Sequence, residues 1–235
     1  MRIMYPDQIT VLAADEENTH YPATNLQDGH TKKLWKATSK DAVVTLTVSA
    51  GASAVAVFNT NAISVKVATT NTSADTIVTY DLTTSNEKNF WAEYSSTIIE
   101  HTVVLTFTAA TGDIVEAGVI SAGTSILFAD PKHGIREGLI DYSIIKKLKN
   151  GAFYLKDTNV VRTFSGRLTL DRDTDFYVFM LDTAKALGSN SFACRVSTNV
   201  TDWEWVVYVR FDGMPKGPHS YPDDSMIDFN LIESL

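Results

Sequence analysis

Histidines and carboxylates, the side chains that most often act as general acids and bases, are spread along this sequence without forming a catalytic motif. The five histidines are His20, His30, His101, His133 and His219. His219, with Asp223 and Asp224, could form an acid/base cluster, but the prolines at 218 and 222 are typical of a rigid loop. The sequence contains no Gly-x-Ser-x-Gly, His-Glu-x-x-His, P-loop or dinucleotide-binding pattern. We therefore expect that the protein is not an enzyme.

A second group of acids has the spacing of a calcium-binding loop. Asp171, Asp173 and Asp175 occupy every second position, and Asp182 is the twelfth residue when Asp171 is counted as the first. An EF-hand loop needs glycine at its sixth position, where this sequence has Phe176. Acids are also common in the first turn of a helix, because they interact favourably with its N-terminal dipole. We interpret these acids as helix-capping residues.

Composition excludes several classes of partner. The net charge of −8 over 235 residues gives no positive surface for a phosphate backbone, so we expect no specific nucleic-acid binding. No run reaches the roughly 18 apolar residues of a membrane span, so we expect no membrane insertion. The first residues lack the apolar run of a secretory signal, so we expect synthesis and retention in a cytosol. The single cysteine, Cys194, cannot form an internal disulfide or a cysteine zinc site, and we interpret it as a buried hydrophobe.

Residues 1–129 have the pattern of an antiparallel β sandwich. In residues 44–48 and 104–108 apolar side chains alternate with threonine, which puts one face of each strand in a core and the other in solvent. Turn-forming residues separate such strands at intervals of about 8 to 12 residues, as in sandwiches and jelly rolls. This part holds 21 threonines, against seven in residues 130–235. The contrast predicts two domains, 1–129 and 130–235.

Residues 130–235 predict a β sandwich with one flanking α-helix. The Asn150-Gly151 pair, between residues 143–149 and 152–156, predicts a hairpin with a type I′ turn. A long strand is expected over residues 159–170. The helix is expected near 174–187, because apolar residues recur there at helical spacing and Gly188 follows. The predicted fold class is therefore mainly β, with one helix.

The segment before the first alternating strand resembles a known family. Asn25-Leu26-x-Asp28-Gly29, followed by a threonine and a tryptophan, is similar to the opening of discoidin-like (coagulation factor 5/8 C-type) jelly rolls, and residues 114–123 look like their last strand. The resemblance implies a structural calcium. By position its ligands would be Ala23, Asp28, Thr31 and Glu116. The alternative is a simple turn at Asp28-Gly29 with Trp35 as a core anchor.

The same resemblance implies glycan binding through aromatic rings on loop tips. Trp91, together with Tyr94 in the segment 88–94, is then the candidate platform. The alternative is that these rings pack as a cap on the sandwich. No other cofactor is expected.

The order of elements in the second half resembles minor tail or baseplate proteins of tailed bacteriophages. The resemblance comes from residues 138–143, the Asn-Gly hairpin, residues 162–168, the helix and residues 192–196. It implies a tail-tube or distal-tail fold that assembles as a ring around the tail channel, although distal-tail proteins usually carry the ring-forming domain first. The residues expected to contact a neighbouring subunit are Lys146, Lys147, Lys149, Asn150 and Gly151. The alternative is a solvated hairpin on a monomer.

Two hypotheses of function follow. The first is a structural subunit of a phage tail tip or baseplate, made in the host cytoplasm and located in the virion tail. Its partners would be further copies of itself, other tail proteins and host-surface polysaccharide. The second is a carbohydrate-binding protein without a role in ring assembly.

Overall fold

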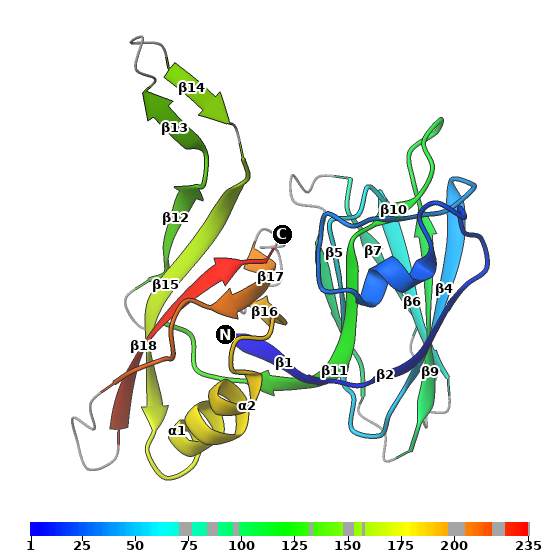
Figure 1. Ribbon diagram of the computed structural model, residues 1–235. Helices are drawn as coiled ribbons and strands as arrows, with labels where there is room; N and C mark the ends of the chain where they lie inside the picture. Colours follow the sequence, from blue (N-terminus) through cyan, green and yellow to red (C-terminus); the bar gives the residue numbers. More distant parts are fainter. Residues whose placement is uncertain are drawn as a thin grey trace. The chain divides into compact units, whose positions relative to one another are not determined.

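The computed structural model describes residues 1–70, 77–83, 89–95, 99–131, 134–147, 153–156, 158–196, 205–217 and 224–234. The chain forms two compact units (Figure 1). Unit 1 comprises Met1–Asp130 and Ser191–Tyr208, and unit 2 comprises Pro131–Asn190 and Val209–Leu235. The first boundary falls one residue from the predicted one. Residues 191–208 were expected in the second domain but belong to unit 1, because β16 (Phe192–Arg195) pairs with β1 (Arg2–Asp7).

Unit 1 is a β sandwich with two layers, each of five antiparallel strands. One sheet has the order β2-β4-β9-β6-β7. Its strands are β2 (Ile9–Ala14), β4 (Asp41–Val48), β9 (His101–Thr108), β6 (Ser64–Thr70) and β7 (Ile77–Asp81). The other runs β16-β1-β11-β5-β8, with β11 (Val119–Leu127), β5 (Ala54–Phe58) and β8 (Phe90–Glu93). The short pair β3 (Trp35–Lys36) and β10 (Glu116–Ala117) and the 3-10 helix η1 (Ala23–Gln27) lie in the connections.

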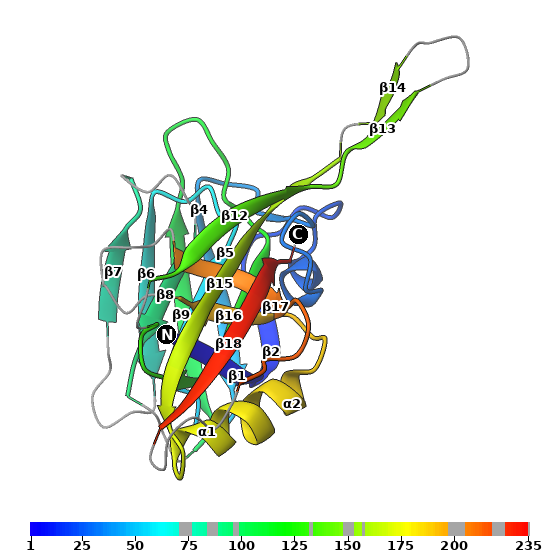
Figure 2. The same cartoon turned by 90° about the vertical axis from the view of Figure 1, so that its left-hand side faces the viewer.

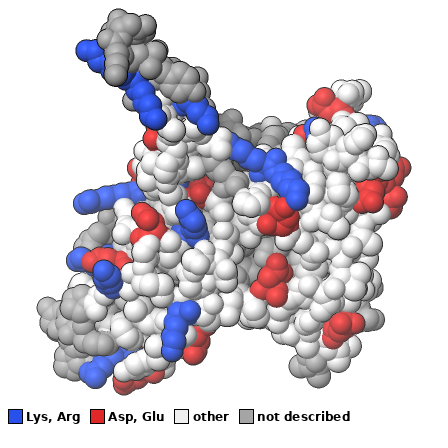
Figure 3. Space-filling model, viewed as in Figure 1, with Lys and Arg blue, Asp and Glu red and all other residues white. Residues whose placement is uncertain are grey.

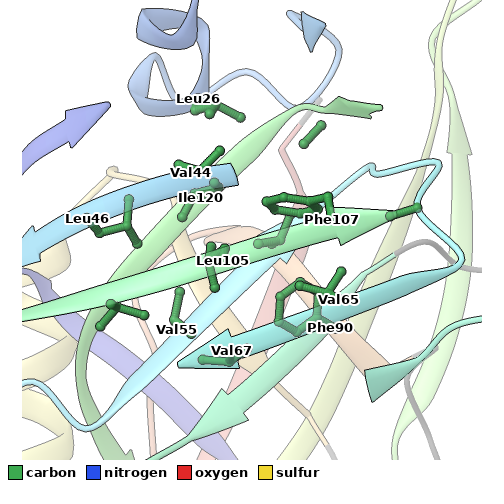
Figure 4. Close-up of a cluster of buried hydrophobic side chains, with 14 of the residues drawn as sticks. Leu26, Val44, Leu46, Val55, Val65, Val67, Phe90, Leu105, Phe107 and Ile120 are labelled. Atoms are coloured by element: carbon green, nitrogen blue, oxygen red, sulfur yellow. The ribbon is translucent and has the colours of Figure 1, made fainter. Parts of the chain in front are cut away.

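The alternation in β4 and β9 produces the core of the sandwich. Every second residue of both strands is buried, as the sequence pattern predicts. In Figure 4, Leu46, Leu105 and Phe107 from one sheet converge with Val55, Phe90 and Ile120 from the other. Each such aliphatic or aromatic side chain contributes about 1.5–3 kcal/mol when it leaves water. The sheets are therefore held by apolar packing, and the threonine-bearing face of β4 and β9 remains partly exposed.

Unit 2 contains a sheet, a helix and a hairpin. Its sheet has the order β12-β15-β18-β17, with β12 (Arg136–Asp141), β15 (Val160–Asp171), β18 (Asp224–Glu233) and β17 (Val206–Phe211), of which residues from Val209 onward belong to unit 2. In Figure 2, β12, β15 and β18 lie side by side. The hairpin consists of β13 (Ile144–Lys147) and β14 (Phe153–Lys156), which confirms the strands predicted on either side of Asn150-Gly151.

The flanking helix is confirmed and runs through α1 (Asp175–Tyr177), η2 (Val178–Ala184) and α2 (Lys185–Leu187), with π-type hydrogen bonds in the middle section. Phe179 is buried and packs edge-to-face on Phe211 of β17, which fixes the helix against the sheet. Gly188 ends the helix with a φ of 57°, a conformation that glycine adopts without strain. The carboxylate of Asp171 accepts hydrogen bonds from the backbone N–H groups of Asp173 and Thr174, so it organises the turn before the helix.

The fold is therefore mainly β with one helix. No helix in the described parts of the chain has the length and apolar character needed to span a membrane.

Candidate functional site

The loop between β2 and β4 is anchored to the sandwich by tryptophan. Trp35 is fully buried and meets the ring of Phe107 edge-to-face, with 6.0 Å between ring centroids. Its neighbour Lys36 pairs with Glu116 in the short β3–β10 ladder. Within the loop, the side-chain amide of Asn25 donates a hydrogen bond to the carbonyl of Leu34 at 2.8 Å. Trp35 is thus the core anchor that the sequence suggested.

Two residues that the sequence did not single out hold the loop closely against the sandwich. Asn59, which follows β5, has a positive φ of 53° and its Nδ2 donates a hydrogen bond of 2.8 Å to the carbonyl oxygen of Thr31. Gly118 lies under the same carbonyl, and a Cβ at this position would stand 2.0 Å from that oxygen. The backbone at Thr31 therefore approaches the sheet at a distance that only glycine permits. The sequence offered only the two residue types as signals: asparagine tolerates a positive φ, and glycine permits a close backbone approach.

The four predicted calcium ligands lie around this loop, but their carboxylates are paired with lysines. Asp28 forms an ion pair with Lys33, and the Glu116 Oε1 atom lies 2.6 Å from the Lys36 Nζ atom. Lys33 lowers the pKa of Asp28 below its ordinary value, and the hydrogen bond to Glu116 raises the pKa of Lys36. The other two positions, Ala23 and Thr31, are buried.

Calcium takes six to eight oxygen ligands and is repelled by nearby ammonium groups. The residues as placed therefore do not fit a calcium ion. Among the residues that the structure describes, no group of three or more His, Cys, Asp or Glu side chains is arranged to hold any metal. Thermal melting with calcium and with chelator tests whether this loop binds the ion.

The lysine that pairs with Glu116 also covers an exposed aromatic ring. The Nζ atom of Lys36 lies 4.8 Å from the ring centroid of Tyr21, and Tyr21 is 41% exposed. We call Tyr21, Lys36 and Glu116 the Tyr21 cluster. The backbone of Glu116 is fixed on both sides, since its carbonyl accepts a 2.7 Å hydrogen bond from the Thr60 hydroxyl and its N–H donates a 2.8 Å hydrogen bond to Asn61. The cluster thus presents one ring, one ammonium group and one carboxylate on a rigid base.

The predicted glycan platform is corrected by the structure. Trp91 is 2% exposed and lies in a cluster with Met4, Phe58 and Val119, because β8 places it opposite Ala56 of β5. Tyr94 is 8% exposed and packs edge-to-face on His101, and burial raises the pKa of its hydroxyl. Neither ring offers a face to a sugar. The packing alternative describes both residues.

Two of the three lysines expected at a subunit contact, Lys146 and Lys147, lie on the described part of the hairpin. Lys146, Lys147 and Lys156 are exposed, and basic side chains gather over the β13–β14 hairpin in Figure 3. Lys149, Asn150 and Gly151 lie outside the described residues. At the base of the hairpin and on the adjoining strands, large apolar side chains face solvent, namely Leu139, Tyr142, Ile144 and Val160. A contact with another subunit here is untested.

Comparison with known proteins gives the following. No protein-family model matches the chain, and the search of curated proteins finds no match. The family 32 carbohydrate-binding module of Clostridium perfringens NanJ, solved in complex with galactose, is 14% identical, with a TM-score of 0.42 over 54% of this chain and 100% of the module. The Clostridium perfringens module CpGH89CBM32-5, in complex with GalNAc-β-1,3-galactose, is 14% identical, with a TM-score of 0.40 over 48% of this chain and 94% of the module.

A structure of a different kind also aligns. A chain from reduced XRCC1 bound to the DNA pol beta catalytic domain is 12% identical, with a TM-score of 0.38 over 53% of this chain and 99% of that chain. At these scores and identities the similarities carry no argument about function. They give no support to the resemblance to bacteriophage tail proteins.

Proposed function

We propose that this protein acts by binding carbohydrate through unit 1 and that it catalyses no reaction. The observation that carries the proposal is the Tyr21 cluster. Sugar rings are recognised by an aromatic ring that contacts their C–H face and by a small number of fixed polar groups that hydrogen-bond their hydroxyls. Tyr21 supplies a partly exposed ring with Lys36 over one face, and Glu116 of β10 holds that lysine; Trp35, Asn59 and Gly118 fasten the loop that carries the ring.

The cluster is suited to binding rather than to acid–base catalysis. The carboxylate of Glu116 and the ammonium group of Lys36 neutralise each other at 2.6 Å, and Glu116 raises the pKa of Lys36 further above neutrality. A general acid or base needs a pKa near the working pH. A paired lysine and glutamate can instead donate and accept hydrogen bonds without transferring a proton.

The proposal is tested with galactosides, the sugars in the solved modules named above. Titration calorimetry of the full chain with GalNAc-β-1,3-galactose, followed by a glycan array, measures binding. We expect Tyr21→Ala to weaken binding at least tenfold, a loss of about 1.4 kcal/mol. The matched control is Tyr177→Ala, which removes a tyrosine of similar exposure from the helix of unit 2. If the array shows no ligand, or if Tyr21→Ala binds as tightly as the unchanged protein, the proposal is wrong.

A second candidate function, a subunit that assembles with copies of itself, is favoured by the hairpin. Residues 143–156 include four lysines and no acid, whereas the whole chain has a net charge of −8. Apolar residues exposed beside a basic hairpin are typical of a contact surface, and the acidic remainder of another copy is a complementary partner. Mass photometry at low and high salt tests this. Assembly should decrease in the double variant K146E/K147E, and a protein that is monomeric at low salt would exclude it.

A further inference from the structure

A hollow of about 360 Å³ lies on the sheet of unit 2, and none of the site residues discussed above lines it. Residues of three neighbouring strands line it: Arg136 of β12, Ser165 and Arg167 of β15, and Asp228 and Asn230 of β18. A volume of this size is at the lower end of small-molecule sites and suits a ligand about as large as one sugar ring.

The strand register places these side chains on one face of the sheet. Arg136 lies directly opposite Ser165, and Ser165 lies directly opposite Asn230. Residues directly opposite each other in antiparallel strands project to the same side of a sheet. Arg167 and Asp228 form the next pair, two residues further along, and so project to that side as well. The result is a row of guanidinium, hydroxyl and amide groups beside an ion pair.

One of the two guanidinium groups is already paired. Arg167 binds Asp228 through two hydrogen bonds, from Nε to Oδ1 at 2.6 Å and from Nη2 to Oδ2 at 3.0 Å. This fork uses both oxygens of the carboxylate, and it lowers the pKa of Asp228, so the acid stays ionised. Asp228 therefore compensates Arg167 and leaves the charge of Arg136 unbalanced.

Arg136 itself is exposed, and within the described chain no hydrogen bond or ion pair of its side chain is found. Its guanidinium is planar, permanently charged and able to donate two parallel hydrogen bonds. A carboxylate is the group that matches this geometry. The hydroxyl of Ser165 and the amide of Asn230, in the same row, offer both donors and acceptors to hydroxyl groups next to that carboxylate.

We propose that this hollow binds a carboxylate carried on a sugar ring, as in a uronic acid. Arg136 pairs with the carboxylate, and Ser165 and Asn230 bind neighbouring ring hydroxyls. The Arg167–Asp228 pair closes the side of the hollow and keeps it polar. The inference stands on unit 2 alone, so it holds or fails independently of the Tyr21 cluster.

The test is titration of the full chain with three probes, followed by calorimetry and by amide NMR shifts of Gly134 and Gly166, which line the hollow. D-galacturonate carries both the ring and the carboxylate, D-galactose only the ring, and acetate only the carboxylate. We expect galacturonate to bind at least tenfold more tightly than either of the other probes, with shifts at the two glycines. The affinity for galacturonate should fall as the salt concentration rises, because salt screens the exposed ion pair between Arg136 and the carboxylate of the ligand.

Variants identify the residue responsible. Arg136→Gln should weaken galacturonate binding at least tenfold, and Asn230→Ala should weaken it to a smaller extent. Arg210→Gln is the matched control, since Arg210 is also an exposed strand arginine of unit 2 that does not line the hollow. The Tyr21→Ala variant should bind galacturonate as the unchanged protein does.

Three outcomes would overturn the proposal. In the first, acetate binds as tightly as galacturonate, which would indicate a general anion site. In the second, Arg136→Gln, folded by circular dichroism, binds galacturonate with unchanged affinity. In the third, binding is lost in Tyr21→Ala, which would place galacturonate in unit 1.

Discussion

Asn59 provides the sharpest test of how the loop of the Tyr21 cluster is held. The residue has a φ of 53°, and its Nδ2 donates the 2.8 Å hydrogen bond to the Thr31 carbonyl, which lies in a buried residue. Loss of a donor to a buried carbonyl costs about 1–2 kcal/mol. Asn59→Gly loses this bond but keeps a residue that tolerates positive φ. Asn59→Ala loses the bond and also places at this positive φ a residue that tolerates the left-handed region less well than asparagine or glycine, at a further cost of about 1 kcal/mol.

We therefore expect Asn59→Ala to be less stable than Asn59→Gly, and both to be less stable than the unchanged protein. Urea unfolding followed by tryptophan fluorescence measures the difference. With an m-value of about 2 kcal/mol/M, a total loss of about 2–3 kcal/mol moves the midpoint by about 1 M or slightly more. Asn190→Ala, at an exposed asparagine with ordinary φ, is the control. Equal midpoints for Asn59→Ala and the unchanged protein, or a lower midpoint for Asn59→Gly than for Asn59→Ala, would refute this account of the loop.

Three further outcomes are expected. The Tm measured with saturating calcium should equal the Tm measured with chelator, because lysines pair with the Asp28 and Glu116 carboxylates. A ligand at 100 times its Kd would raise the free energy of unfolding by about 2.7 kcal/mol, so a clear rise in Tm would show that calcium binds. Cys194, whose pKa burial raises to about 12, should resist thiol reagents at pH 8 in the folded protein and react after unfolding; rapid modification of the native protein would contradict its burial. Lys33 lowers the pKa of Asp28, so this carboxylate stabilises the fold above the unfolded pKa near 4 and loses that effect as pH falls through the lower folded pKa. Asp28→Asn should therefore flatten the acid side of the stability curve, and an unchanged curve would argue against the ion pair.

Local patterns in the sequence determine much of the secondary structure. The alternation of β4 and β9 follows from the period of two that side chains have along a strand. The helix over 175–187 follows from the spacing of Phe176, Phe179 and Leu187, and the hairpin from the turn preference of Asn-Gly. Each of these features depends on residues that are neighbours in the chain.

Partners distant in the chain were decided only by the tertiary structure. For Trp91 the sequence left two readings open, an exposed ring implied by the family resemblance and a packed ring, and the pairing of Trp91 with Ala56 places the indole in a buried cluster. A single sequence shows that Trp91 is large and apolar, and it does not show which strand lies beside it. The pairing of β16 with β1 was missed for the same reason, because it joins residues nearly 200 positions apart.

The two binding surfaces proposed above depend on tertiary structure in the same way. Lys36 and Glu116 meet across 80 residues, and Arg136, Ser165 and Asn230 come into one row through the register of three strands. A shift of one residue in the pairing of these strands would send the side chains of the shifted strand to the opposite face of the sheet. The sequence by itself therefore determined which segments are strands, helix and turn, because those depend on local periodicity. Only the tertiary structure decided which charged and aromatic groups share a surface, because that depends on strand order and register.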